Sequence, residues 1–196
     1  MPRTSTLLAV ALILTAAPLA QAQTAAPLTK DQLIQSAVLP LPEELRPAAT
    51  VLGHGAAGTM ETLRKGTGSM ICLADDPTSA AFHVACYHQS MEPFMARGRA
   101  LRAEGVAGAQ VDTVRFAEVV AGKLPMPTAA ASLYSITGDG YDLATGEITS
   151  GRRLYVVYIP FATPESTGLP GLPVAGAPWI MFPGTPKAHI MFIPGM

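Results

Sequence analysis

The only two cysteines of this 196-residue chain, Cys72 and Cys86, have a spacing that suits a cross-strand disulfide. Two short apolar runs, 69–73 and 82–87, flank a turn-forming segment centred on Ser79. In a hairpin folded about that residue, positions whose numbers sum to 158 face each other, and the two cysteines meet this condition. Directly opposed strand residues lie about 4.5–5.5 Å apart, within disulfide reach. The sequence therefore predicts a structural disulfide; a redox-active pair is the alternative, which the missing Cys-x-x-Cys spacing disfavours.

Histidines and a glutamate near Cys86 are residue types that can hold a metal ion or catalyse hydrolysis. His83 and His88 lie on either side of Cys86, and Glu92 follows His88 by four residues. Because zinc takes three or four nitrogen, sulfur or oxygen ligands, His83, His88 and Glu92 form a candidate metal site. Together with His54 they form a candidate hydrolase site. The alternative is that all are ordinary strand-end or loop residues, since no His-Glu-x-x-His or similar motif is present.

The chain's only tryptophan suggests a candidate pocket. Trp179 precedes a rigid Pro-Gly turn at 183–184, and His189 follows that turn. His54 lies between two glycines, which let a ligand approach the backbone. His54, Trp179 and His189 are therefore a candidate pocket wall. The alternative, which the sequence favours, is a β-hairpin whose tryptophan fills the core.

A basic cluster is expected on the first central helix. Arg97, Arg99 and Arg102 are close enough in sequence to bind an anion together. The alternative is a solvated helix face, on which the arginine stems cover apolar surface. A solvated face is the commoner explanation for such spacing.

The first half of the chain predicts a short helix followed by short strands. Thr29 and Gln32 fit a capping box, and apolar positions 33, 34, 37 and 38 form one stripe that ends before Pro40. Apolar runs then recur between glycine-rich or turn-forming segments, which predicts an antiparallel meander. These runs are 49–52, 59–64, 69–73 and 82–87. A helix over 80–88 is the alternative for the last of them.

Two helices are predicted in the middle of the chain, and strands return after them. Ser90 and Asp112 are the expected N-caps, and Gly105 and Gly122 the expected ends. The predicted later strands are 133–137, 153–159, 179–182 and 189–193, with an irregular loop at 160–178. The fold class is therefore α+β: a mainly antiparallel sheet of about six to eight short strands, two central helices and a short N-terminal helix.

Residues 1–22 have the composition of a cleaved export signal. One charge, Arg3, precedes an apolar run at 7–14, and the segment closes on the small-x-small pattern at 20–22. The apolar run is shorter than the about 20 residues that a membrane span needs, and no later segment is long and apolar enough. We expect a signal peptide at 1–22, a flexible leader at 23–28 and a single soluble domain over 29–196. The expected location is the periplasm or the extracellular space of a bacterium.

Composition limits the partners without naming an activity. Removal of Arg3 leaves 12 basic and 14 acidic residues, so the chain lacks the positive electrostatic field that attracts nucleic acids. No motif identifies a cofactor. We expect an exported, non-catalytic domain that binds a small molecule or a protein partner, or has a structural role. The alternative is a periplasmic or secreted hydrolase, metal-assisted or not, that uses His54, His83, His88 and Glu92.

Overall fold

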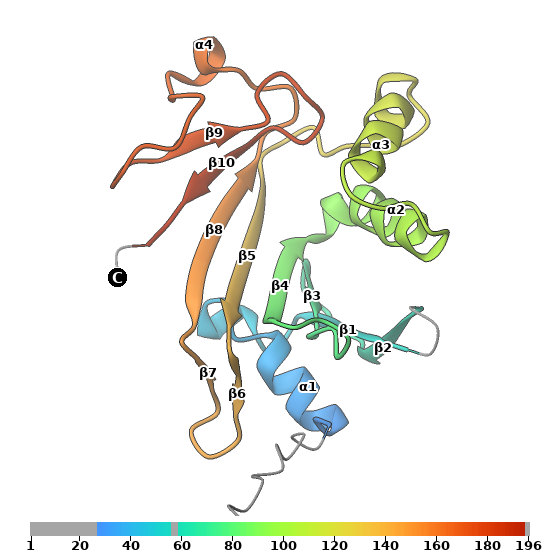
Figure 1. The fold of residues 1–196 in the computed structure, drawn as a ribbon, viewed down its shortest axis with the longest axis vertical. Helices are drawn as coiled ribbons and strands as arrows, with labels where there is room; N and C mark the ends of the chain where they lie inside the picture. Colours follow the sequence, from blue (N-terminus) through green and yellow to red (C-terminus); the bar gives the residue numbers. More distant parts are fainter. Residues whose placement is uncertain (1–26, 56–58, 195–196) are drawn as a thin grey trace, which may run out of the picture.

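The computed structural model describes residues 27–55 and 59–194, which form one large sheet with helices against both faces (Figure 1). Eight strands pair in the order β2-β1-β3-β4-β5-β8-β10-β9, and β6 pairs with β7 in a separate hairpin. This arrangement confirms the predicted α+β class. The predicted export signal at 1–22 and most of the predicted leader lie outside the described residues. Leu28, the last leader position, packs against the cluster around Phe82 and Ile136.

The strands are short, and their bounds follow the predicted runs closely. In the first half they are β1 (Thr50–His54), β2 (Met60–Arg64), β3 (Met70–Leu73) and β4 (Phe82–His88). In the second half they are β5 (Ala131–Gly138), β6 (Gly140–Asp142), β7 (Glu147–Thr149), β8 (Arg152–Tyr158), β9 (Trp179–Met181) and β10 (His189–Phe192). The segment at 82–87 is thus a strand, and the helical alternative is wrong. The predicted loop at 160–178 is irregular except for one helical turn, α4 (Pro164–Thr167).

The N-terminal helix α1 (Lys30–Ala37) covers one face of the β1–β3–β4 part of the sheet. Its capping box is formed by Thr29 and Gln32, as the sequence predicts. Leu33, Ile34, Ala37 and Val38 pack there against a buried cluster that contains both cysteines. A single 3₁₀ turn, η1 (Glu43–Leu45), follows.

Helices α2 (Glu92–Ala103) and α3 (Gln110–Val120) lie against the opposite face. Alternation along β3 separates the two faces: Cys72 points to the α1 side, and Ile71 and Leu73 point to the α2 side. The larger core cluster there includes the fully buried Tyr87 and Phe94. In the part of the chain that the structure describes, no helix is both long enough and apolar enough to cross a membrane.

The two predicted N-caps are wrong in detail. Ser90 lies inside a 3₁₀ turn, η3 (Gln89–Met91), where its backbone N–H donates to the side chain of His88. Asp112 lies within the first turn of α3, whose N-cap is Ala109. In both cases the polar side chain that resembles a cap bonds elsewhere. Asp112 pairs with two basic side chains that are described below.

The predicted antiparallel meander is also wrong at one connection. After β2 the chain crosses back past β1, and β3 then pairs with β1 in parallel. The crossing requires a close approach at Gly66, whose N–H donates to Thr50 Oγ1 at 3.1 Å. A Cβ atom at Gly66 would collide with the carbonyl oxygen of Ala48, so only glycine fits this crossing.

The disulfide between Cys72 and Cys86 is present and confirms the predicted register. In the β3–β4 ladder Met70 faces His88, and the two cysteines face each other. Both cysteines have no exposed surface. The bond therefore joins the centres of two neighbouring strands beneath α1, where a reductant has no direct access.

Candidate functional site

Two of the histidines named from the sequence lie near a pair of aspartates at one end of β1, β3 and β4. His54 Nδ1 is 4.0 Å from Asp76 Oδ2, and the backbone N–H of His83 donates to Asp75 at 2.7 Å. His83 Nδ1 is 2.8 Å from Thr137 Oγ1. Burial raises the pKa of Asp75, whereas hydrogen bonds from Thr78 lower the pKa of Asp76. Burial also lowers the pKa of His83, against the attraction of Asp75.

The other members of the predicted metal and hydrolase sites lie elsewhere. His83 and His88 are at opposite ends of β4, about 16 Å apart along an extended strand. His88 is engaged by Ser90, and both carboxylate oxygens of Glu92 are used by other side chains. The residues that the structure describes include no group of three or more His, Cys, Asp or Glu placed to hold a metal ion.

The predicted pocket of His54, Trp179 and His189 is not assembled. Trp179 and His189 lie on the neighbouring strands β9 and β10, but β3, β4, β5 and β8 separate β10 from β1, which carries His54. Five strand spacings correspond to about 24 Å. Trp179 is buried, as the core-filling alternative expects, and its indole N–H has no partner among the described residues.

A different cavity, of about 240 Å³, lies between the sheet and helices α2 and α3. We call it the basic pocket. Its lining residues are Leu73, Leu133 and Tyr158 from the sheet, Phe94, Met95, Arg99 and Arg102 from α2, Arg115 from α3, and Lys187 from the loop before β10. The sheet thus supplies an apolar floor with one phenol, and the helices and the loop supply four cations.

Arg99 is fixed by a network that starts on β4. Its guanidinium donates to Glu92 Oε1 at 2.6 Å and to the hydroxyl oxygen of Tyr87 at 2.9 Å. The Tyr87 hydroxyl in turn donates to Glu92 Oε2 at 2.5 Å. Burial, followed by the bond to Glu92, raises the pKa of Tyr87, so it stays a neutral donor. The network orients Arg99 and neutralises its charge.

Arg115 is the most deeply buried cation of the basic pocket, with 5 % of its surface exposed. It pairs with Asp112, donates to the carbonyl oxygen of Phe94 and lies over the Phe94 ring at 3.9 Å. Its Nε is buried without a partner among the described residues. Lys187 binds the second Asp112 oxygen at 2.8 Å. Although burial favours the neutral acid, these two cations together hold the pKa of Asp112 below its usual value.

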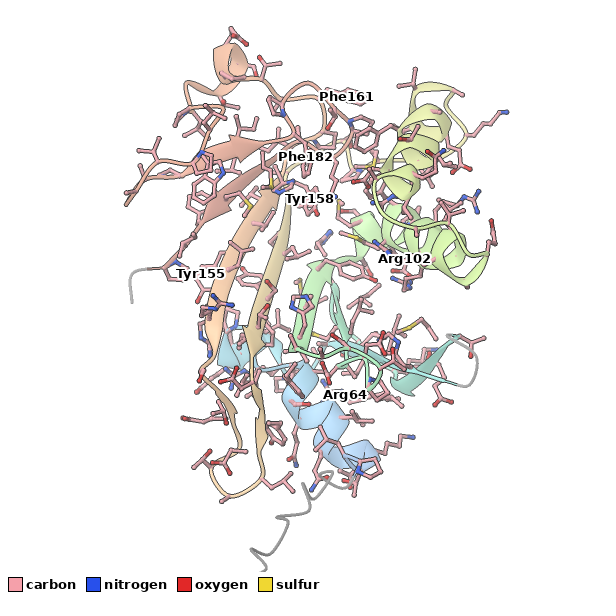
Figure 2. The ribbon with its side chains drawn as sticks, in the orientation of Figure 1. Arg64, Arg102, Tyr155, Tyr158, Phe161 and Phe182 are labelled. Carbon is pink, nitrogen blue, oxygen red and sulfur yellow. A yellow bond between two sulfur atoms is a disulfide. The ribbon has the colours of Figure 1, made fainter. Side chains whose placement is uncertain are left out.

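Arg102 is the one cation of the basic pocket without a carboxylate partner in the described part of the chain. Its guanidinium donates only to the carbonyl oxygen of Gly98, one turn earlier on α2. Figure 2 shows Arg102 on α2 across from Tyr158 on β8. Four cations thus face two carboxylates, Glu92 and Asp112, which leaves two positive charges uncompensated.

Tyr158 is a neutral group at the floor of this charged cavity. Burial raises its pKa to about 12, although the charge of Arg115 opposes the shift. No hydrogen bond joins its hydroxyl to another described residue. A neutral phenol donor beside uncompensated cations suits an anionic oxygen.

The three arginines predicted to act together therefore belong to two different environments. Arg99 and Arg102, three residues apart, share the helix face that lines the basic pocket. Arg97 points away and forms a bidentate pair with Glu118 on α3, as well as a bond to Glu104. Sequence spacing does not indicate Arg115 and Lys187, because only the fold brings them close to α2.

Larger hollows on the surface lack this combination of charge and apolar floor. One of about 540 Å³, around Trp179 and Phe192, is lined by apolar residues, proline and glycine without a charge. Another, of about 480 Å³, has Glu43 and Glu147 opposite Arg46 and Arg153. The basic pocket is the hollow whose charge most clearly favours one class of ligand.

His189 lies beside the basic pocket and predicts a pH dependence of stability. It is 5 % exposed, and its Nδ1 donates to the carbonyl oxygen of Lys187 at 2.6 Å. Burial lowers its pKa below the ordinary value of about 6.5. As the pH falls below about 6.5 the unfolded chain binds the proton first, so the free energy of unfolding decreases until the folded pKa is passed.

We expect His189→Asn, which keeps the donor to Lys187 but does not titrate, to flatten this dependence. Urea unfolding at pH 7.5 and pH 5.0 measures it. The loss of stability on acidification should be smaller in the variant than in the wild type, and an equal loss in both would contradict the assignment to His189.

Comparison of the chain with known protein families, with curated proteins and with solved structures finds no match.

Proposed function

We propose that this chain is an exported binding domain that holds a small carboxylate ligand in the basic pocket. The observation that carries the proposal is the excess of cations around an apolar floor: Arg102 and Lys187 stand beside Arg115, and Glu92 and Asp112 offset only part of the charge. A volume of about 240 Å³ lies slightly below the about 300–1,000 Å³ of typical ligand pockets, so the ligand is small.

The hydrogen-bond partners of the four cations indicate which role each has. Arg99 and Arg115 are held by carboxylates and backbone, so they fix the shape and potential of the site. Arg102 has free guanidinium nitrogens and is the group assigned to bind the anion directly. Lys187 shares Asp112 with Arg115 and adds a second cation at the rim.

Export is part of the proposal. A buried disulfide suits an oxidising compartment, because the cytosol keeps most thiols reduced. The export signal expected at 1–22 points the same way. A binding domain of this kind would meet its ligand outside the cytosol.

Calorimetric titration with hexanoate at low salt tests the proposal. We expect hexanoate to bind and the neutral hexanol not to, with affinity that weakens as salt rises. Because a hydrogen bond to a charged group contributes about 1.5–3 kcal/mol, Arg102→Gln should weaken binding about tenfold or more. Arg97→Gln is the matched control, since it removes a cation from the same helix but outside the pocket. Equal binding of hexanol, or equal losses in both variants, would contradict the proposal.

A further inference from the structure

Two exposed phenylalanines near the basic pocket have a backbone conformation that side chains of this kind rarely adopt. Phe161 and Phe182 have φ of 63° and 54°, in the left-handed region, and are 48 % and 41 % exposed. Hydrogen bonds between the two segments hold them there: Phe161 N–H donates to the carbonyl oxygen of Thr185, and Gly184 N–H to that of Ala162. Strained backbone that presents an apolar ring to solvent is a feature of ligand sites.

Phe182 is connected to the basic pocket by direct contacts. Lys187 Nζ, a pocket cation, lies 4.6 Å from the centre of the Phe182 ring. The ring centre is also 5.8 Å from that of His189, which is 4.9 Å from that of Tyr158 on the pocket floor. The aromatic groups therefore form a continuous series from the floor to the surface. Figure 2 shows Tyr158 and Phe182 close to each other on the side of the sheet toward α3.

We propose that the ligand of the basic pocket is a small aromatic monocarboxylate, whose ring packs against Phe182 while its carboxylate reaches Arg102 and Lys187. This inference rests on the proposed function and narrows its ligand class. An aromatic ring beside Lys187 gains contact with an exposed ring that otherwise faces water. The carboxylate occupies the pocket, and the ring extends past Lys187, which lines the pocket and also contacts Phe182.

The matched controls come from the chain itself. Phe161 shares the strained conformation and the exposure of Phe182, but among the described residues its ring has no contact with Lys187 or His189 of the kind that Phe182 makes. Phe161→Leu and Phe182→Leu both remove a ring at a left-handed position and keep an apolar side chain. Phe182→Tyr keeps the ring.

Calorimetry with 3-phenylpropionate and hexanoate, two monocarboxylates that differ in the ring, tests the inference. We expect the wild type to bind 3-phenylpropionate about three- to tenfold more tightly than hexanoate. Phe182→Leu should abolish this preference, whereas Phe161→Leu and Phe182→Tyr should keep it. Thermal unfolding of each variant establishes that it is folded.

The possible failures are distinguishable. If hexanoate and 3-phenylpropionate bind the wild type equally, the aromatic ligand class is wrong and the anion pocket stands. If the preference survives in Phe182→Leu, or is lost equally in Phe161→Leu, the contact with Phe182 is wrong. If neither acid binds, the proposed function itself is wrong.

Discussion

Replacing Asp112 with alanine is expected to lower the free energy of unfolding by about 3–5 kcal/mol. The carboxylate binds Arg115 and Lys187 at once, and its removal leaves the Arg115 charge buried with only a carbonyl oxygen and a ring as partners. The lost charge also favoured the N-terminal turn of α3. Urea unfolding at pH 7 measures the effect.

The pH dependence of the difference in stability between wild type and Asp112→Ala distinguishes loss of the carboxylate charge from loss of packing. Because the pKa of Asp112 is below its usual value in the folded protein, its stabilising effect is present at neutral pH and is lost as the pH falls through that lowered value. The difference between wild type and Asp112→Ala should therefore shrink below about pH 4. Glu118→Ala, which breaks the Arg97 pair at the surface, is the control and should change stability far less. Similar losses in the two variants would contradict the role of burial.

Removing the disulfide by the double substitution C72A/C86A is expected to cost about 3 kcal/mol of stability. The bond closes a loop between residues 14 apart, so an unfolded chain that keeps the bond has a lower conformational entropy than one without it. The two side chains are also fully buried against α1, and their truncation loosens that packing. Urea unfolding of the two proteins gives the difference.

Two further observations accompany this prediction. The denaturant slope should rise in the double variant, because its unfolded chain is less compact. A thiol titration of the native wild type should find no free thiol, since the structure leaves no free cysteine. Unchanged stability, or two reactive thiols in the native protein, would refute the structural role of the bond.

Local features of the fold were predictable because their signals lie within a few residues of one another. The capping box of Thr29 and Gln32 and the register that pairs Cys72 with Cys86 both come from short-range patterns. The parallel pairing of β1 with β3 was not predictable in this way. The glycines at 66 and 68 resemble a hairpin turn in the sequence, and only the packing against Ala48 reveals a crossing.

The candidate site was only half predictable for the same reason. Arg99 and Arg102 share a helix face, which the sequence spacing indicates, but Lys187 reaches Asp112 across 75 residues of chain. Conversely, His83 and His88 are close in sequence yet far apart on an extended strand. Closeness in sequence therefore predicted spatial neighbours correctly on helix α2, whereas on strand β4 it suggested a contact between His83 and His88 that the extended backbone prevents.

The most direct test of the basic pocket is to locate a bound carboxylate on the protein. Amide ¹H–¹⁵N spectra of the labelled protein, recorded during a titration with hexanoate, report which segments respond. We expect saturable shifts concentrated at 94–102 on α2, around Arg115 on α3 and around Lys187, and their loss in Arg102→Gln. Shifts confined to the apolar hollow around Trp179 and Phe192, or no saturable shifts at all, would contradict an anion site between the sheet and the two helices.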